Sequence, residues 1–474
     1  MLQSPCDQAV ARTASGAPLR ESAANERWTL VATILGSSLS FIDATIVNVA
    51  IPRIARDLSA DAAGAQWTIG AYLLPLAAFV LVGGALGDRY GHRRIFIIGL
   101  SLFAAASAAC GIAPSLTHLL VARAAQGTAA ALFVPASLSL LGTTFHGAAR
   151  GKAIGTWSAF GSVASAVGPV IGGWLVDRWS WRAAFFLNLP IAAATLVIAI
   201  WQVCASRQQE TRRIDVGGAL AAMVTLGLLT AALTFSHLGA TVTLALVAAG
   251  AAAFVVFIAI EQRVPDPMMP LDVWRSRLFA SVNALTFVVY AALSIFMFIL
   301  PLRLIVGSGL SATASAAALL PIVVELFALS RWTGMWASRA GPRLPLLIGA
   351  CFIAVGFALL AALGGQDYWR DFFPGIVVLG LGMAMMVAPL TASVMAALGD
   401  ARAGLASGIN NAVARTAGLA GVSAVALIAG ARTQVELAAA FPQVMVAASA
   451  LAACGAIVAG LFVRGEASRP LQAE

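Results

Sequence analysis

Residues 84–99 read GALGDRYGHRRIFIIG, and residues 334–349 read GMWASRAGPRLPLLIG. Glycines and arginines of the two segments match at a constant offset of 250: Gly84, Arg89, Gly91, Arg93 and Gly99 match Gly334, Arg339, Gly341, Arg343 and Gly349. Each segment is rich in glycine and arginine and lies between two long apolar runs, as a loop between membrane helices does. The repeat therefore predicts two halves of similar structure that have the same orientation in a membrane.

The composition excludes a water-soluble protein. The 474 residues are 60% hydrophobic and 10% charged, whereas soluble domains have about 45–50% and about 25%. A soluble fold could not bury so much apolar surface, and the same excess argues against disorder and against nucleic-acid binding. The five cysteines and four histidines have no metal-ligand spacing, so we expect no metal site and no cofactor.

The apolar runs predict an all-α integral membrane protein, because each is long enough to cross a bilayer as a helix of about 20 residues. A porin-like barrel would need alternating strands, and these runs are continuous. Two six-helix, pseudo-symmetric halves and a two-helix insertion between them account for the offset of the repeat. The fourteen predicted spans are 28–52, 66–87, 95–113, 117–142, 152–176, 184–204, 215–236, 240–261, 278–302, 312–331, 344–364, 371–396, 403–429 and 443–463.

The basic residues predict the orientation. With both termini in the cytoplasm, 19 of the 29 lysines and arginines fall in tails and cytoplasmic loops, seven fall in outer loops and three fall inside spans. This distribution obeys the positive-inside rule and explains the net charge of +9 without an anionic partner. We expect a multi-pass protein of the cell (inner or plasma) membrane.

Five regions follow from the spans. We expect a flexible cytoplasmic tail at 1–27, a six-helix bundle at 28–204, an extra hairpin with cytoplasmic linkers at 205–277, a second six-helix bundle at 278–464 and a cytoplasmic tail at 465–474. The hairpin carries no charge between Asp215 and Glu261. We therefore expect it to be peripheral or lipid-facing, outside the substrate path.

Five motifs resemble those of one family, in the expected order and spans. They are Ile42-Asp43-Ala-Thr-Ile-Val-Asn48-Val-Ala-Ile-Pro52; Gly84-Ala-Leu-Gly-Asp88-Arg89-Tyr-Gly91-His-Arg93-Arg94; Arg123-Ala-Ala-Gln126-Gly127; Gly168-Pro169-Val-Ile-Gly172-Gly173; and Trp181-Arg182 followed by Phe186, Asn188 and Pro190. Over nearly all of residues 28–464 the chain resembles the major facilitator superfamily, in its fourteen-span drug:proton antiporter branch. The resemblance implies export of amphipathic or cationic small molecules in exchange for protons, by rocking-type alternating access.

Two motifs take structural roles from this resemblance. The loop motif would be a cytoplasmic latch that holds the halves together in one state, formed by Gly84, Asp88, Arg89, Gly91, Arg93 and Arg94. Ordinary topology-setting charge is the other interpretation of these residues. The second copy has Ser338 in place of Asp88, so the latch is expected on one side only. In the span-five antiporter motif, Gly168, Pro169, Gly172 and Gly173 would form a seam between halves, with static helix packing as the alternative.

Charges inside the spans are the candidates for mechanism, because a charge in the bilayer costs several kcal/mol and needs a partner, a water-filled cavity or a proton. Apart from acids at the first or last residue of a span, we place only Asp43 and Glu325 inside spans. Asp43, in the outer half of span one, is the predicted proton-coupling acid, because burial disfavours its ionised form. Arg123 would favour the ionised form of a nearby acid. A structural hydrogen bond for Asp43 and a structural ion pair for Arg123 remain the alternatives.

The substrate cavity is predicted from polar residues of the second half. Glu325 in span ten could recognise a cationic or polar substrate, or it could pair with Arg331 towards the cytoplasm. Asn410, Asn411 and Arg415 in span thirteen resemble an Asn–Arg–Gly pattern of the branch.

Other functions were weighed against transport by exchange. An exporter dedicated to one siderophore, self-made antibiotic or lipid-like product fits the sequence as well. An integral-membrane enzyme would need clustered His, Asp, Ser or Cys at a membrane face, and a channel would not need the repeat. The expected partners are a small-molecule substrate, protons and the lipid bilayer, with a monomeric protein; the sequence leaves a periplasmic adaptor open.

Overall fold

The computed structural model describes residues 23–145, 147–203, 215–235, 238–265, 267, 269–363, 365–398, 402–431 and 433–463. In these ranges the chain consists of helices and short turns, without strands. The helices of the first part are α2 (Ala23–Asp57), α3 (Ala62–Tyr90), α4 (His92–Gly111), α5 (Leu116–Thr144), α6 (Gly147–Arg178), α7 (Trp181–Phe186), α8 (Asn188–Trp201), α9 (Val216–Thr234) and α10 (Ala240–Arg263). The others are η2 (Leu271–Arg275), α11 (Arg277–Leu302), η3 (Arg303–Gly307), α12 (Ala312–Ala317), α13 (Leu320–Ala340), α14 (Arg343–Leu363), η4 (Tyr368–Phe372), α15 (Phe373–Ala396), α16 (Ala403–Ala429), α17 (Gln434–Ala439) and α18 (Phe441–Phe462).

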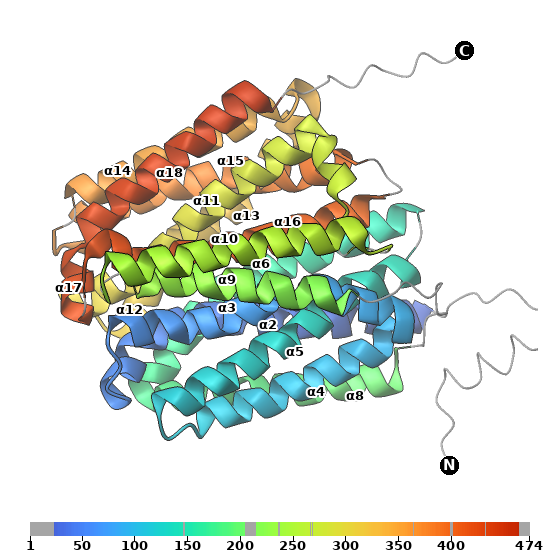
Figure 1. Cartoon of the computed structure of the whole chain (residues 1–474), viewed down its shortest axis with the longest axis horizontal. Coiled ribbons are helices and arrows are strands. Elements are labelled where there is room, and N and C mark those ends of the chain that lie inside the picture. Colours follow the sequence, from blue (N-terminus) through green and yellow to red (C-terminus); the bar gives the residue numbers. More distant parts are fainter. Residues whose placement is uncertain are drawn as a thin grey trace, which may run out of the picture. The chain divides into compact units, whose positions relative to one another are not determined.

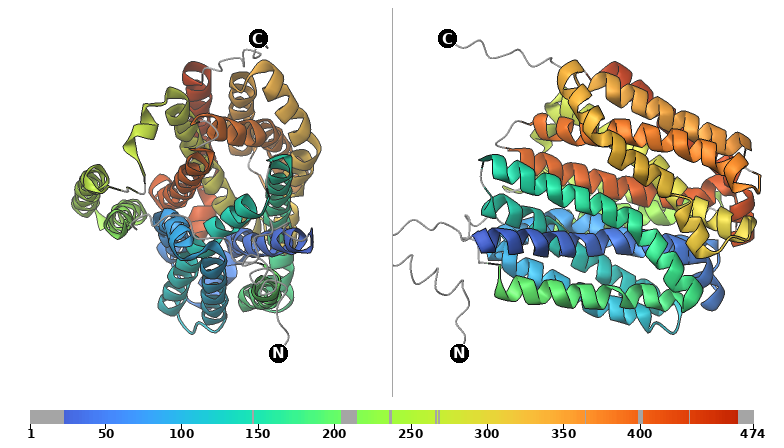
Figure 2. Two further views of the ribbon diagram at one scale, coloured as in Figure 1. Left: turned by 90° about the vertical axis from the view of Figure 1, so that its right-hand side faces the viewer. Right: turned by 180° about the vertical axis from the view of Figure 1, so that it is seen from behind.

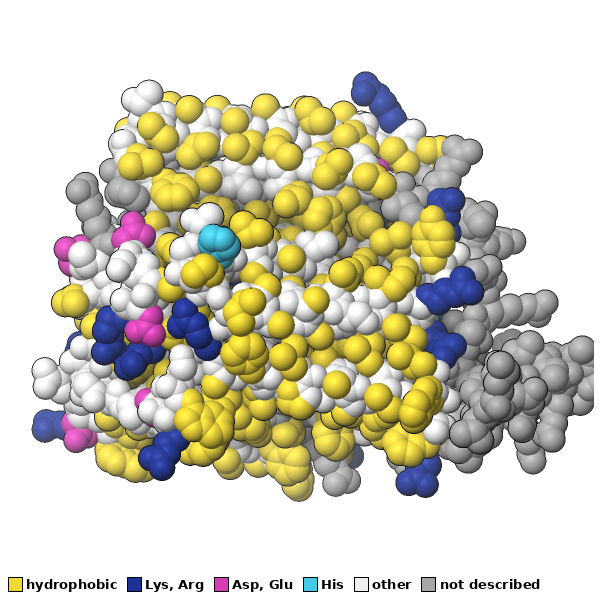
Figure 3. Space-filling view, turned by 90° about the horizontal axis from the view of Figure 1, so that it is seen from below, with side chains coloured by type: hydrophobic (Ala, Val, Ile, Leu, Met, Phe, Trp, Pro, Cys, Tyr) yellow, Lys and Arg dark blue, Asp and Glu magenta, His cyan; other side chains and the backbone are white. Residues whose placement is uncertain are grey.

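The predicted all-α membrane fold is confirmed. Thirteen helices in the described ranges are long and apolar enough to cross a membrane. The remaining predicted span, 152–176, lies in α6, whose 32 residues exceed the length that a bilayer requires. On the face drawn in Figure 3, hydrophobic side chains cover the middle and most charged side chains gather at its two ends, as lipid on one side and water at both ends require.

The described helices form two compact units. Unit 1 is drawn from residues 1–60, 67–226 and 251–268, and unit 2 from residues 61–66, 227–250 and 269–474. The predicted bundle at 278–464 falls in unit 2, and the bundle at 28–204 falls in unit 1 except for residues 61–66. The division crosses the hairpin, so the boundaries 205–277 stay a prediction. Helix α2 begins at Ala23, inside the predicted tail 1–27, and the tail at 465–474 lies outside the described residues.

The two units repeat the same helix packing. In unit 1, α4 packs against α5 and α8, and α2 packs against α6 (Figure 1). In unit 2, α14 packs against α15 and α18, and α11 packs against α16 (Figure 2). The core of unit 1 contains Phe96, Phe103 and Phe133, whose rings meet edge to face and are fully buried.

The matched glycines of the repeat have matched conformations. Gly91 separates α3 from α4 with φ +93°, and Gly341 separates α13 from α14 with φ +79°. This left-handed region is strained for side chains with a Cβ, which explains glycine at both positions. Gly99 lies against the backbone of α5, and Gly349 lies against the backbone of α15. The predicted repeat is therefore present in the structure as well as in the sequence.

The matched arginines also make equivalent contacts. Arg93 donates from Nε to the Ala199 carbonyl at 3.1 Å and from Nη2 to the Ile200 carbonyl, both in the last turn of α8. Arg343 donates from Nη2 to the Gly460 carbonyl in the last turn of α18. The last four carbonyls of a helix lack intrahelical partners, and a cation is favourable there. Each arginine thus ties the start of one helix to the end of another helix of its unit.

Candidate functional site

Asp43 and Arg123 form an ion pair inside unit 1. Arg123 Nη1 lies 2.6 Å from Asp43 Oδ2, and the two side chains are 1% and 2% exposed. Asp43 is on α2 and Arg123 is on α5, so the pair joins two helices that are far apart in sequence. The two residues that the sequence nominated for proton coupling therefore meet in the structure.

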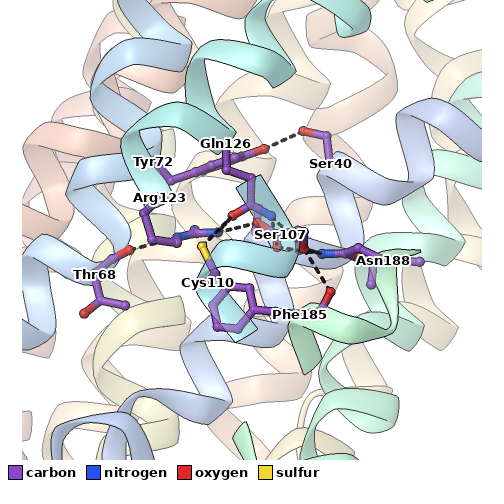
Figure 4. Close-up of polar contacts among 12 residues, drawn as sticks. Ser40, Thr68, Tyr72, Ser107, Cys110, Arg123, Gln126, Phe185 and Asn188 are labelled. Atoms are coloured by element: carbon purple, nitrogen blue, oxygen red, sulfur yellow. Dashed lines mark hydrogen bonds and ion pairs between the residues drawn. The ribbon is translucent and has the colours of Figure 1, made fainter. Parts of the chain in front are cut away.

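Two amides complete the coordination of Asp43. Gln126 Nε2 and Asn188 Nδ2 donate to Asp43 Oδ1 at 2.9 and 3.0 Å. The same two nitrogens donate to Ser107 Oγ at 3.2 and 2.9 Å, and Ser107 donates to the Phe185 carbonyl. Figure 4 shows these side chains converging from several helices on one point. The carboxylate of Asp43 thus accepts three N–H bonds.

Arg123 has other partners besides Asp43. Its Nη1 also donates to Gln126 Oε1 at 2.7 Å, and its Nε donates to the Thr68 carbonyl at 3.2 Å. The Arg123 Cζ lies 4.4 Å from the centroid of the Tyr72 ring, a distance typical of cation–π contact. The guanidinium would therefore keep several favourable contacts if its bond to Asp43 were lost.

The two charges of this pair depend on each other. Breaking one partner out of a buried ion pair costs about 3–5 kcal/mol, because the other charge is left without compensation. The pair therefore holds α2 and α5 together at this point.

Several site residues were missed or left without a role by the sequence analysis. Gln126 and Asn188 stand in quoted motifs without an assigned role, and Ser107 was not noticed. Spacing could have indicated Gln126, because positions three apart on a helix share a face and Arg123 was already a candidate. Asn188 reaches Asp43 through the packing of α8 against α2, and Ser107 reaches Asn188 through the packing of α4 against α8, which no local pattern reveals.

The glycines of the span-five motif lie against α2 within unit 1. A Cβ placed on Gly168 would be 2.5 Å from Thr45 Oγ1 and 3.2 Å from Ile42 Cα, and one on Gly172 would be 2.7 Å from Ile46 Cγ1. Glycine is needed here for the close approach of two backbones. These contacts differ from the expected seam between halves, because both helices belong to the same unit. They place α6 directly beside the Asp43 segment.

The predicted latch residues have their described contacts inside unit 1. Asp88 Oδ1 lies 3.3 Å from His92 Nε2, one turn further along the chain. Arg89 lies over the Tyr90 ring, and Arg93 reaches α8 as described above. Gly84 has space, since the nearest atom to an added Cβ is Pro135 Cβ at 3.9 Å. Arg94 is exposed. A latch between the halves stays a prediction.

The predicted cavity residues are divided between two helix contacts in unit 2. A Cβ placed on Gly380 of α15 would lie 1.9 Å from Glu325 Oε2, so this carboxylate rests against the α15 backbone. Asn410 Nδ2 donates to Asn283 Oδ1 at 3.0 Å and to Thr286 Oγ1 at 2.8 Å, both on α11. Arg415 is near enough to Tyr290 of α11 to interact with it electrostatically. Asn411 is half-buried. The side chain of Arg331 lies outside the described residues.

The extra hairpin contains a pair of acids that the sequence analysis placed at span ends and did not use. Asp215 and Glu261 are 6% and 3% exposed. A Cβ on Gly218 would lie 2.4 Å from Asp215 Oδ2 and 2.7 Å from Glu261 Oε1, so the two carboxylates are neighbours. Asp215 Oδ1 also accepts the Gly218 N–H at 2.7 Å, which caps the start of α9. The sequence analysis gave neither acid a role, and the structure brings them together because the start of α9 lies beside the end of α10.

Comparison with known proteins identifies the family. The family model described as Major Facilitator Superfamily matches residues 33–422. The chain belongs to this superfamily. Among its relatives, the multidrug resistance protein Stp of Mycobacterium tuberculosis is 35% identical over 388 residues, which are 81% of this chain and 72% of Stp. The tetracenomycin C resistance and export protein of Streptomyces glaucescens is 33% identical over 413 residues, 85% of this chain and 76% of that protein. The drug efflux pump JefA of M. tuberculosis is 30% identical over 412 residues, 86% and 81% of the two chains.

Solved structures of superfamily members share the fold. The peptide transporter POT in complex with sulfate superposes with a TM-score of 0.68 at 15% identity and covers 96% of this chain and 99% of that chain. A bacterial homologue of the human lysosomal transporter Spinster superposes with a TM-score of 0.64 at 18% identity, covering 94% and 98%. The chain is thus a multi-pass membrane transporter rather than an enzyme.

Proposed function

We propose that this superfamily member exports amphipathic or cationic small molecules from the cytoplasm in exchange for protons, by rocking-type alternating access. The relatives named above are resistance and efflux proteins, which supports export. The charge distribution supports a protein of the cell (inner or plasma) membrane with both termini in the cytoplasm, and we propose that it acts as a monomer. A periplasmic adaptor is not needed for this scheme.

The buried ion pair between Asp43 and Arg123 is the observation that best supports proton coupling. A buried ion pair adds little net stability compared with apolar packing, so its presence calls for another explanation. The pair joins α2 to α5 through a group that can be neutralised by one proton. Intramembrane acids paired in this way are the usual elements of proton relays in transporters.

The coupling follows from the penalty for an unpaired charge. With Asp43 ionised, separation of α2 from Arg123 leaves two buried charges without an opposite charge beside them. With Asp43 protonated, Arg123 keeps its bonds to Gln126 and Thr68, and the helices can separate at lower cost. Proton binding from outside therefore favours one arrangement of the helices, and proton release favours the other. The equilibrium shifts only because the two arrangements differ in proton affinity.

The span-five glycines connect the Asp43–Arg123 pair to helix α6. Gly168 and Gly172 of α6 contact α2 at residues on either side of Asp43. A small movement of α2 at Asp43 should therefore displace α6, since α6 has no side chain at these two positions and lies directly against Ile42, Thr45 and Ile46 of α2. This is the part of the antiporter motif that we assign to exchange.

The second half supplies the proposed substrate contacts. Glu325 would attract a cationic or polar substrate, and Asn410, Asn411 and Arg415 would contribute hydrogen bonds and a fixed charge. The Glu325 carboxylate is half-buried and its Oε2 has no hydrogen-bond partner among the described residues, which supports a role in binding. The residues Gly84, Asp88, Arg89, Gly91, Arg93 and Arg94 would stabilise one end state as the cytoplasmic latch.

Everted membrane vesicles test the proposal. Vesicles that contain the wild-type chain are acidified inside, and a panel of cationic and neutral dyes is added while the internal pH and dye uptake are followed. We expect dye-dependent proton loss that a protonophore abolishes. Asp43→Asn should abolish it, while Asp272→Asn, which changes an exposed carboxylate outside the spans, should not.

Three outcomes would contradict parts of the proposal. Dye transport that survives the protonophore would exclude proton exchange. Proton exchange that is unchanged in Asp43→Asn would exclude the assigned acid. A response to a single compound in a broad panel would favour the dedicated exporter.

A further inference from the structure

Helix α2 carries a buried polar face that ends at Asp43. Thr29, Thr33, Ser37, Ser40 and Asp43 are each at most 2% exposed. Their spacings of four, four, three and three residues place them on one side of the helix. A run of four hydroxyl residues leading to the acid is unusual in a helix that is otherwise apolar, because each hydroxyl must be desolvated.

This polar face extends to only one side of Asp43. Beyond it, the fully buried positions of α2 include Ile46, Val47, Ala50 and Ile54. The hydroxyls therefore run from Asp43 towards the N-terminal end of α2, which the proposed orientation places in the cytoplasm.

Neighbouring helices place further hydroxyls on this face. Ser40 Oγ lies 2.7 Å from Tyr72 OH of α3, and Ser37 Oγ lies 2.7 Å from Ser137 Oγ of α5. Trp157 Nε1 of α6 donates to Ser37 Oγ at 2.9 Å. In the Ser40–Tyr72 pair either oxygen can be the donor. Ser137 donates its own proton to the Val134 carbonyl at 2.7 Å, so Ser37 is the donor to Ser137.

The first pair adjoins the ion pair directly. The ring of Tyr72 contacts the Arg123 guanidinium, and its hydroxyl reaches Ser40, as Figure 4 shows. Ser40 is also three residues before Asp43 on the same helix face, so the Cβ atoms of the two residues are about 5–6 Å apart. A change in the position of Asp43 or Arg123 therefore alters the surroundings of this hydroxyl pair.

We propose that the proton released by Asp43 leaves unit 1 along this face of α2, first through Ser40 and Tyr72 and then through Ser37 and Ser137. The inference rests on the proposed proton exchange and names its internal route. As Arg123 re-forms its bond to Asp43, the carboxyl O–H proton moves to a hydroxyl oxygen. Each hydroxyl that accepts a proton donates its own to the next oxygen of the route, and water at the cytoplasmic end of α2 takes the last proton, so no hydroxyl keeps a net charge. A water molecule would complete the step of one helical turn between Ser40 and Ser37.

Tyr72→Phe and Ser40→Ala test the route, because each removes one hydroxyl and keeps most of the packing. Tyr72→Phe also keeps an aromatic ring over Arg123. The purified chain is reconstituted into liposomes with a pH dye inside, and substrate-driven proton movement and equilibrium dye binding are measured in H2O and D2O. We expect proton movement to slow about tenfold or more, with dye binding unchanged and a different solvent isotope effect.

Two further variants separate a relay from a structural role. Ser40→Thr keeps a hydroxyl and should restore most of the rate that Ser40→Ala loses. Thr195→Val is the matched control, since Thr195 is fully buried in the same unit and bonds only to the backbone of its own helix in the described contacts. It should leave the proton rate unchanged.

The outcomes are distinct. Wild-type rates and isotope effects in Tyr72→Phe and Ser40→Ala would overturn the route while leaving the exchange intact. Equal losses in Thr195→Val would show that general loss of packing is responsible, which also overturns it. If the wild-type chain moves no protons with substrate, the proposed exchange itself fails, and the route fails with it.

Discussion

At the residue scale, the decisive feature is that Asp43 has partners for both oxygens. Arg123 occupies Oδ2, while Gln126 and Asn188 share Oδ1. Single substitutions therefore leave a buried charge or a buried amide without a partner, and such losses are more costly than the net contribution of the bonds themselves. The effects of changing Asp43 and Arg123 should consequently be far from additive.

A double-substitution cycle tests this coupling. Arg123→Gln alone leaves Asp43 without its cation and should lower the free energy of unfolding by about 3–5 kcal/mol. Asp43→Asn with Arg123→Gln removes both charges, so most of this loss should be recovered. Thermal unfolding of the purified chain in detergent measures both. Proton exchange should be absent in the double variant even though it is stable. Additive losses would show that the pair is not coupled.

At the element scale, helix α6 is packed tightly at Gly168 and loosely at Gly155. Gly168 touches α2, whereas an added Cβ on Gly155 of the same helix would meet no atom within 4 Å. Gly168→Ala should lower the free energy of unfolding by about 1–3 kcal/mol, because the new methyl group separates two backbones. It should also impair transport. Gly155→Ala should be neutral or slightly stabilising, because alanine favours the helix. Equal Tm values for the two variants would contradict this packing.

The repeated arginines give a second prediction for elements. Arg93→Ala frees two carbonyls at the end of α8, and Arg343→Ala frees one at the end of α18. Each should lower the free energy of unfolding by about 0.3–1 kcal/mol, or up to about 2 kcal/mol if the site is well shielded. The measurement is Tm in detergent, with exposed Arg56→Ala as the control. A loss in one half alone would mean that the two arginines are not equivalent.

At the scale of the whole molecule, the uneven distribution of arginine predicts the orientation of the chain. A reporter enzyme that is active only outside the cytoplasm should be active when fused after Gly239, between α9 and α10. It should be inactive when fused after Val264, at the end of α10. The reverse pattern would invert the topology and the direction of the proposed proton route. Activity of neither fusion, with both proteins present in the membrane, would argue that the hairpin does not cross.

The helices, their order and the internal repeat could all be predicted from the sequence alone. Apolar length specifies a membrane helix because the bilayer leaves few alternatives for the backbone. The glycines at 91 and 341 were predictable as matched, since a left-handed turn restricts the residue locally. The sequence also nominated Asp43 and Arg123, because a charge among apolar residues stands out without knowledge of its neighbours.

Which residues meet became visible only in three dimensions. Asn188 and Ser107 reach the Asp43 site from α8 and α4, and Tyr72 reaches Arg123 from α3. The structure also shows that Gly168 and Gly172 of the span-five motif contact α2, and that Asp215 lies near Glu261 in the hairpin. Hydropathy and spacing report the environment of a residue along one helix. The direction in which that helix faces its neighbours depends on the packing of all of them together, and for that reason no single segment could reveal these contacts.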